Sequence, residues 1–460
     1  MYNKETIKTL SLSITKMSLP ILVEQFFIVL MGVVSTMLVG NVGRDAVSAV
    51  GNIDVINNIM ISIFSALSIG GTVVVAQYTG RNDLKSASIA SAQAVMASVV
   101  LSVAVTLAIF LNQHSLIDLL YGQAEPAVVS NSLAYLKIVV WSYPPLALAT
   151  TIFGLLRGYG NMRAPMAISI VMNVLNIAIS SVLIYGLHFK VGSLQLTIPG
   201  QGVSGAATGL TLARLIGFVL AVIVLRRSEL TFSFLPQDFW RVERTMLGRI
   251  LHLGVPAGLE QLMFNGGKLI VQIFIVSLGT VALASNAICN AIAALATMPT
   301  IAMSLTLTTM IGQAIGRHDR DQARQILNFA VPFYSVILLA MSLLFLPFIQ
   351  LIVGLFTQDA ATRQLSIQIM IFYLIAQPLL WPPSFALPAG YRGTGDVRFQ
   401  LYVTIGSMWI LRVGLGAILT QFTSIGLFGI WIAMIADWFV RSIFFSLRLK
   451  SGKWLQANII

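Results

Sequence analysis

Residues 17–25 read Met-Ser-Leu-Pro-Ile-Leu-Val-Glu-Gln, and residues 253–261 read Leu-Gly-Val-Pro-Ala-Gly-Leu-Glu-Gln. The proline, the glutamate and the glutamine of the first stretch return 236 residues later as Pro256, Glu260 and Gln261. Each copy opens an apolar run long enough to cross a bilayer, so a helix breaker and an acid lie inside a membrane helix, where both are unfavourable. The double placement indicates a functional role and an internally repeated fold.

The composition identifies the class of protein. Of the 460 residues, 57% are hydrophobic and 10% are charged, and the mean hydropathy is +0.88. Soluble proteins average about 25% charged residues. We therefore expect a polytopic membrane protein with room for about twelve helices of about 20 residues. Because the chain has one cysteine, Cys289, a disulfide framework and a thiolate metal site are excluded, and we expect no cofactor and no metal.

Apolar runs between polar or glycine-rich breaks predict twelve membrane helices, six in each half. The predicted ranges are 14–39, 48–79, 87–111, 127–153, 164–186, 202–225, 250–278, 280–314, 324–347, 362–388, 399–421 and 424–447. Since six is even, both halves enter the membrane with the same orientation, and a pseudo-twofold axis along the membrane normal relates them. The prediction is an all-α membrane fold with an N-terminal lobe at 1–225, a cytoplasmic linker at 226–249 and a C-terminal lobe at 250–460.

Further motifs recur between the halves. Residues 80–81 and 316–317 both read Gly-Arg, and residues 157–160 and 392–395 read Arg-Gly-Tyr-Gly and Arg-Gly-Thr-Gly. No Lys-Ser/Thr follows them, so we interpret them as turns that end helices rather than as phosphate loops. The first half also carries an insertion at 188–199, whose alternating apolar residues predict a small hairpin.

The basic residues of the loops predict the orientation in the membrane. The N-terminus, the loops on its side and the C-terminal end, with Arg441 included, hold 21 of the 28 Lys and Arg residues, whereas the opposite loops hold three. By the positive-inside rule, the richer side and both termini are cytoplasmic. The net charge of +12 is therefore a topology signal rather than the sign of a nucleic-acid site.

Two of the acids within predicted helices stand in the repeated motif. Glu24 and Glu260 have no basic residue three or four positions away, and each lies one turn after a proline that frees a backbone carbonyl. We interpret the two glutamates as sites of cation coupling. Pro20 and Pro256 are candidate helix hinges, although a fixed kink is the alternative for each proline taken alone.

The other two acids within predicted helices have basic residues near them. Asp437 lies one turn before Arg441, and Arg412 is expected at a similar depth across the last helical hairpin. We predict a structural ion pair between Arg412 and Asp437. Asp54 is expected to meet Lys137 and is a third candidate for cation coupling.

Amide side chains within the helices predict a polar substrate cavity. Asn173 and Asn176 are three positions apart and so lie on one helix face. A single amide can equally serve as packing between helices, which is the alternative for each residue taken alone. The candidate cavity residues are Gln25, Gln261, Asn57, Asn173, Asn176, Asn265 and Gln377.

These motifs resemble the multidrug and toxic compound extrusion (MATE) family. The resemblance rests on the two Pro-x-x-x-Glu-Gln openings, the Gly-Arg loops, the Arg-Gly-x-Gly loops and the Gly-Val-Ser-Gly of residues 202–205, in that order over essentially the whole chain. It implies a two-lobed bundle that exchanges H+ or Na+ for amphipathic, often cationic, drugs by alternating access.

The chain departs from the family pattern at two positions. The resemblance implies an aspartate late in the first helix and, in some members, another in the fifth helix, where this chain has Ser35 and Ser180. A serine does not exchange a proton near neutral pH and is a poor Na+ ligand without a carboxylate nearby. We therefore expect coupling to lie elsewhere, with Glu24 and Glu260 as the first candidates.

The expected function is cation-coupled multidrug efflux in the bacterial inner membrane. We expect small-molecule drugs, the coupling cation and the lipid bilayer as partners, no nucleic acid, and a monomer. The alternative is a flippase for lipid-linked glycans, which would line its cavity with several arginines, whereas this count leaves only Arg214 and Arg412 within spans. The sequence has no set of residues that could form a buried catalytic site, which argues against a membrane enzyme. The internal repeat, with prolines inside helices, favours a rocking transporter over a channel.

Overall fold

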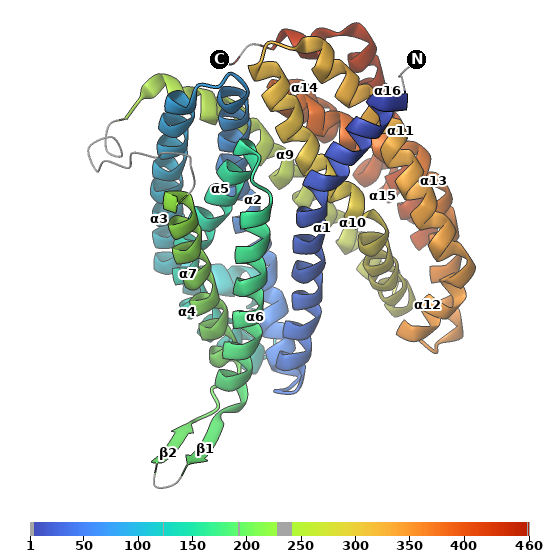
Figure 1. Cartoon of the computed structure of the whole chain (residues 1–460). Coiled ribbons are helices and arrows are strands. Elements are labelled where there is room, and N and C mark those ends of the chain that lie inside the picture. Colours follow the sequence, from blue (N-terminus) through green and yellow to red (C-terminus); the bar gives the residue numbers. More distant parts are fainter. Residues whose placement is uncertain (1–3, 123, 192–193, 228–241, 458, 460) are drawn as a thin grey trace. The chain divides into compact units, whose positions relative to one another are not determined.

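Figure 1 shows the computed structural model of the chain, which describes residues 4–122, 124–191, 194–227, 242–457 and 459. Twelve helices among these residues are long and apolar enough to span a membrane. A helix pairs its own backbone polar groups and can therefore lie in lipid without leaving them unsatisfied. The prediction of an all-α membrane protein with twelve spans is confirmed.

The first six spans alternate with short turns. They are α1 (Lys4–Gly40), α2 (Arg44–Gly80), α3 (Leu84–Tyr121), α4 (Pro126–Val139) joined to α5 (Tyr143–Tyr159) by the 3₁₀ turn η1 (Val140–Ser142), α6 (Arg163–Tyr185) and α7 (Val203–Arg227). An antiparallel hairpin of β1 (Leu187–Val191) and β2 (Leu194–Ile198) joins α6 to α7, as the alternating pattern of the insertion predicts. The helix α1 begins ten residues before the predicted start, because the polar N-terminal segment is helical as well.

The second six spans follow the same order. They are α9 (Arg244–Ser277), α10 (Thr280–Gly316), α11 (Arg320–Phe345) continued by η2 (Leu346–Phe348) and α12 (Ile349–Phe356), α13 (Ala360–Thr394), α14 (Val397–Ser407) continued by the π-helix η3 (Met408–Leu415) and α15 (Gly416–Phe422), and α16 (Leu427–Ser451), which the 3₁₀ turn η4 (Lys453–Gln456) follows. Most of the predicted linker, 226–249, lies outside the described residues, and α9 begins within its last part.

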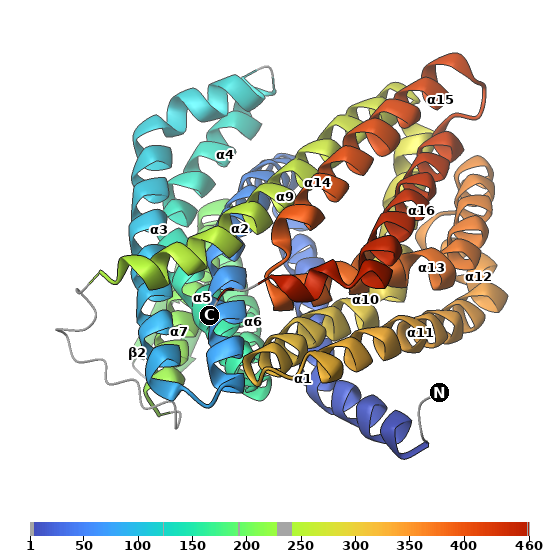
Figure 2. The same cartoon turned by 90° about the horizontal axis from the view of Figure 1, so that it is seen from above.

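The helices form two compact units. The first unit contains Val23–Val75 and Asp83–Gly258, and the second contains Met1–Leu22, Ala76–Asn82 and Leu259–Ile460. In the first unit α7 packs against α4, α5 and α6, and in the second unit α13 packs against α10, α11 and α16 (Figure 2). The predicted lobes, 1–225 and 250–460, remain a prediction, since parts of α1 and α2 group with the second unit.

The repeated motifs produce the same local geometry in both halves. The helices α5 and α13 end at Gly160 and Gly395, whose φ angles of 102° and 99° lie in the left-handed region that glycine adopts without steric cost. Asp83 and Asp319 cap the N-termini of α3 and α11, and their carboxylates accept a hydrogen bond from the backbone N–H three residues on. The Gly-Arg and Arg-Gly-x-Gly motifs therefore end helices, as predicted.

Candidate transport site: polar cavities inside the two units

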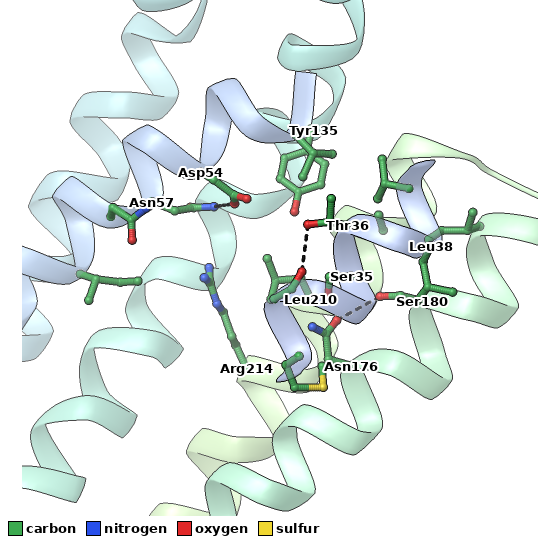
Figure 3. A pocket seen from close by; sticks show the side chains of 18 residues that line it. Ser35, Thr36, Leu38, Asp54, Asn57, Tyr135, Asn176, Ser180, Leu210 and Arg214 are labelled. Atoms are coloured by element: carbon green, nitrogen blue, oxygen red, sulfur yellow. Dashed lines mark hydrogen bonds between the residues drawn. The ribbon is translucent and has the colours of Figure 1, made fainter. Parts of the chain in front are cut away.

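The first unit contains a polar cavity of about 310 Å³, which we call the Asp54 cavity (Figure 3). Residues of α1, α2, α4, α6 and α7 form its walls. Its polar lining consists of Ser35, Thr36, Asp54, Asn57, Asn58, Tyr135, Asn176, Ser180 and Arg214. The cavity therefore brings together three predicted site residues, Asp54, Asn57 and Asn176.

Asp54 is the acid of this cavity. Its side chain is exposed to the cavity and accepts a hydrogen bond from Nδ2 of Asn57 at 3.3 Å. Asp54 forms no ion pair in the part of the chain that the structure describes. The base that shares the cavity is Arg214, not the predicted Lys137, and Nη1 of Arg214 donates to Oγ of Ser142 at 2.6 Å.

The two serines that depart from the family pattern lie in the same cavity. Figure 3 shows Ser35 on α1 and Ser180 on α6 close to Asn176. The hydroxyl of Ser180 donates to Oδ1 of Asn176 at 3.0 Å. Serines therefore occupy the two positions of this cavity at which the resemblance implies aspartates. The carboxylate of the cavity belongs instead to Asp54 on α2.

Glu24 lies outside this cavity and is already neutralised. It is 3% exposed, and Nη2 of Arg157 on α5 donates to its two carboxylate oxygens at 2.6 and 2.7 Å. This partner was not predicted from the sequence, because Arg157 lies 133 residues from Glu24, in the Arg-Gly-Tyr-Gly motif. The arrangement is a charge-assisted pair that fixes α1 to α5.

Glu260 lines a second cavity, of about 430 Å³, inside the second unit; we call it the Glu260 cavity. Neutral groups hold its carboxylate, since Nε2 of Gln400 donates to Oε2 at 2.6 Å and the hydroxyl of Thr404 donates to Oε1 at 3.2 Å. Arg392 lines the same cavity but forms no ion pair with Glu260 within 4 Å. The predicted residues Gln261 and Asn265 line this cavity too.

The predicted pair of Arg412 and Asp437 is replaced by a different one. Asp437 is fully buried, and its Oδ1 accepts a hydrogen bond from Nε of Arg441 at 2.8 Å. The same Nε also lies 2.9 Å from Oγ of Ser407. Arg441 is itself 2% exposed inside α16, so it is a structural charge and not one of the loop charges among which the topology count placed it.

Arg412 lines a third cavity, of about 230 Å³, also inside the second unit; we call it the Arg412 cavity. Its lining consists of Lys268, Val271, Gln272, Ile275, Asn286, Asn290, Arg412, Ile430, Trp431 and Met434. The sequence analysis places Arg412 within a span, and Lys268 is not among the predicted site residues. The sequence feature that could have indicated this site is the presence of two bases at membrane depth in one half of the chain.

The remaining predicted cavity residues lie elsewhere. Gln377 is fully buried, and its Nε2 donates to Oγ of Ser342 at 3.1 Å, so it belongs to the packing of α13 against α11 rather than to a cavity wall. Gln25 and Asn173 lie outside the three cavities. Pro20 and Pro256 lie within the continuous helices α1 and α9. Their role as hinges remains a prediction.

Twelve membrane-length helices with polar cavities among them have the architecture of a membrane transporter. The family model MatE matches the chain twice, over residues 20–182 and 256–418. The chain belongs to the MatE family, which confirms the resemblance seen in the motifs. The two matches also follow the internal repeat, because they begin at Pro20 and at Pro256.

Two relatives match almost the full length of the chain. It is 29% identical over 455 residues to the uncharacterized transporter YisQ of Bacillus subtilis, covering 97% of this chain and 96% of the relative. It is 25% identical to the "Probable multidrug resistance protein NorM" of Thermotoga maritima, covering 99% and 96%. A solved structure described as the outward-facing conformation of a multidrug resistance MATE family transporter matches with a TM-score of 0.85 at 22% identity, covering 96% of each chain, and shows the shared fold.

Proposed function

We propose that this protein exports amphipathic, often cationic, small molecules across the bacterial inner membrane in exchange for H+ or Na+, by alternating access. The membership of the MatE family and the multidrug-resistance names of full-length relatives support this function. The excess of loop charge on one side supports an orientation with both termini in the cytoplasm. The comparisons do not favour the flippase alternative.

The observation that carries the proposal is the position of Asp54. A carboxylate at membrane depth is costly while it is charged, unless a base pairs with it or water reaches it. Asp54 forms no ion pair among the described residues and faces a polar cavity, so a cation can reach it and remove that cost. An H+ neutralises the charge directly. A Na+ ion would use the oxygen ligands beside Asp54, such as Oδ1 of Asn57 or Asn176.

The free energy available from such an exchange is sufficient for efflux. One elementary charge that moves inward across a potential of about 100 mV supplies about 2.3 kcal/mol. Since about 1.4 kcal/mol corresponds to a tenfold ratio of concentrations, one ion per cycle supports a gradient of about fiftyfold for a substrate without net charge. For a monovalent cationic substrate the exchange moves no net charge, and the concentration gradient of the coupling ion supplies the free energy instead. The proposed function therefore requires that cation binding at Asp54 promotes release of the drug, rather than only stabilising the fold.

Substitution of Asp54 tests this assignment. We expect Asp54→Asn to lower gradient-driven uptake of the cationic dye ethidium at least about tenfold, because an amide neither binds a proton nor attracts Na+. Exchange of dye without an ion gradient should persist. The measurement uses inverted proteoliposomes in which pH and Na+ gradients are imposed separately.

Asp45→Asn is the matched control, since Asp45 lies in the first turn of the same helix and outside the Asp54 cavity. Its transport should equal that of the parental protein. If Asp54→Asn pumps at the parental rate with the same ion dependence, Asp54 does not take part in coupling.

A further inference from the structure

The second unit gathers three bases around one aromatic ring. The Nζ of Lys268 lies 4.8 Å from the centroid of the Phe264 ring, the guanidinium carbon of Arg441 lies at 5.3 Å, and that of Arg412 lies at 5.7 Å. They come from α9, α16 and the π-helix η3. The negative face of an aromatic ring attracts cations, but a neutral ring does not cancel three charges.

One of the three bases is neutralised within the fold. Arg441 holds the buried carboxylate of Asp437 and also contacts Ser407. Lys268 and Arg412 form no hydrogen bond and no ion pair in the part of the chain that the structure describes, and Nε of Arg412 is buried without a partner. Asp437 attracts Arg412 at longer range, but Arg441 repels it.

Both of these bases face the Arg412 cavity. No acid lines this cavity, and its other polar groups are the amides of Gln272, Asn286 and Asn290. The Oδ1 of Asn286 accepts a hydrogen bond from Nε1 of Trp431 at 3.3 Å, so the amide leaves its NH₂ group as a donor. The wall therefore offers two cations and amide donors, while Ile430, Trp431 and Met434 supply apolar surface.

The backbone supports the position of Arg412. The predicted continuous helix 399–421 is interrupted by the π-helix Met408–Leu415, which carries Arg412. Wide turns of this kind are rare and often mark functional sites, because they change the direction of side chains at a cost in hydrogen-bond geometry. The sequence repeat gives Arg412 and Lys268 no basic counterparts: Ile177 and Gly32 stand 235 and 236 residues earlier. Lys268 and Arg412 therefore occur in one half only and are not among the features that the repeat gives to both halves.

We propose that the Arg412 cavity binds the carboxylate of an amphipathic substrate, with Arg412 and Lys268 as its ligands. A base within a membrane span is costly while it is charged, and a bound anion offsets that cost at two bases together. A guanidinium can take a carboxylate through two parallel hydrogen bonds, and the ammonium adds a third. The apolar wall beside them suits the body of the same molecule. This inference rests on the proposed export function and extends its substrates from cations to zwitterions and anions.

Two dyes with one fluorophore and opposite charge test the proposal. Binding of dansylglycine, an anion, and dansylcadaverine, a cation, is measured by fluorescence titration of the full-length protein in dodecyl maltoside, with empty micelles subtracted. We expect Arg412→Gln and Lys268→Gln each to raise the Kd of dansylglycine at least about tenfold, as loss of a charge-assisted hydrogen bond predicts. Arg412→Lys should retain part of the affinity, and dansylcadaverine should bind each variant as it binds the parental protein.

Arg363→Gln is the control, because it removes one positive charge outside all three cavities and should change neither Kd. Thermal unfolding of each variant verifies that it is folded, and Arg412→Lys provides a substitution that keeps the charge. If the double variant Lys268→Gln with Arg412→Gln binds dansylglycine like the parental protein, the proposal is wrong. Displacement of dansylglycine by phosphatidylglycerol, but not by phosphatidylcholine, would assign the site to a lipid headgroup and overturn it as well. The assay uses no ion gradient, so its failure leaves the efflux assay with Asp54→Asn unaffected.

Discussion

Glu24 and Glu260 come from the same repeated motif, and their surroundings differ. Glu24 is almost fully buried and paired with Arg157 through both carboxylate oxygens. Glu260 is half-buried on the wall of a cavity and held by the neutral groups of Gln400 and Thr404. Removal of the charge of Glu24 would leave the partly buried guanidinium of Arg157 without its ion-pair partner, whereas Glu260 forms no ion pair among the described residues and attracts Arg392 only at longer range. The repeated position therefore holds an ion-paired carboxylate in one half and a carboxylate on the wall of a cavity in the other.

The partners explain how the two halves diverged. Arg392, the counterpart of Arg157, stands 235 residues later, lines the Glu260 cavity and forms no ion pair with Glu260. Gln400 takes its place as donor, while the residue 235 positions before Gln400 is Pro165, which has no side-chain donor. The repeat thus places an acid at the same position of both halves. The residues of the helix packed against it determine whether the acid forms an ion pair or only neutral hydrogen bonds.

The largest effect is expected from breaking the locked pair. Glu24→Gln should lower stability by about 2 to 3 kcal/mol, less than for a fully buried pair because the Arg157 side chain is 16% exposed. Thermal unfolding of the purified protein and the yield of monodisperse protein measure this loss. Adding Arg157→Leu should recover part of it, since no unpaired charge is then buried. A Glu24→Gln protein as stable as the parental one would show that the pair contributes nothing to the fold.

Glu260→Gln should affect transport and leave the fold nearly unchanged. Glutamine keeps the shape and can still accept a hydrogen bond from Gln400, so we expect a stability change below about 1 kcal/mol. Gradient-driven efflux should fall at least about tenfold, because the amide cannot bind a proton. Dye uptake in proteoliposomes and thermal unfolding are measured on the same preparation. Unfolding of Glu260→Gln at the temperature at which Glu24→Gln unfolds would contradict the contrast between the two sites.

The smallest effect is expected from Thr404→Val. This change keeps the shape of the side chain and removes the hydroxyl that donates to Oε1 of Glu260 at 3.2 Å. A single hydrogen bond to a carboxylate contributes about 1.5 to 3 kcal/mol at good geometry, and this one is long, so an effect of about 1 kcal/mol is expected. Gradient-driven efflux should fall about fivefold, which is less than in Glu260→Gln, and the same proteoliposome assay measures it. Efflux at the parental rate would show that Thr404 does not contribute to coupling.

The sequence was sufficient to predict the elements that depend on local chemistry. Apolar runs and the repeat predicted the twelve spans, and the left-handed glycines at 160 and 395 explain why both Arg-Gly-x-Gly motifs end a helix. Side-chain partners on different helices could not be predicted from the sequence, since the base that neutralises Glu24 lies 133 residues away along the chain. Asp437 was assigned to Arg412 from depth alone, but the base one turn along the same helix is closer. The π-helix that carries Arg412 has no signature in an apolar run.

The most direct test of the contrast compares coupling per folded molecule in two variants. Proteoliposomes are prepared with Glu260→Gln and with the double variant Glu24→Gln and Arg157→Leu, and the ratio of gradient-driven uptake to gradient-free exchange is measured for each. We expect a ratio near the parental value for the double variant, because the pair of Glu24 and Arg157 stabilises the fold. We expect a ratio at least about tenfold lower for Glu260→Gln. Loss of coupling in the folded double variant, with parental coupling in Glu260→Gln, would contradict it.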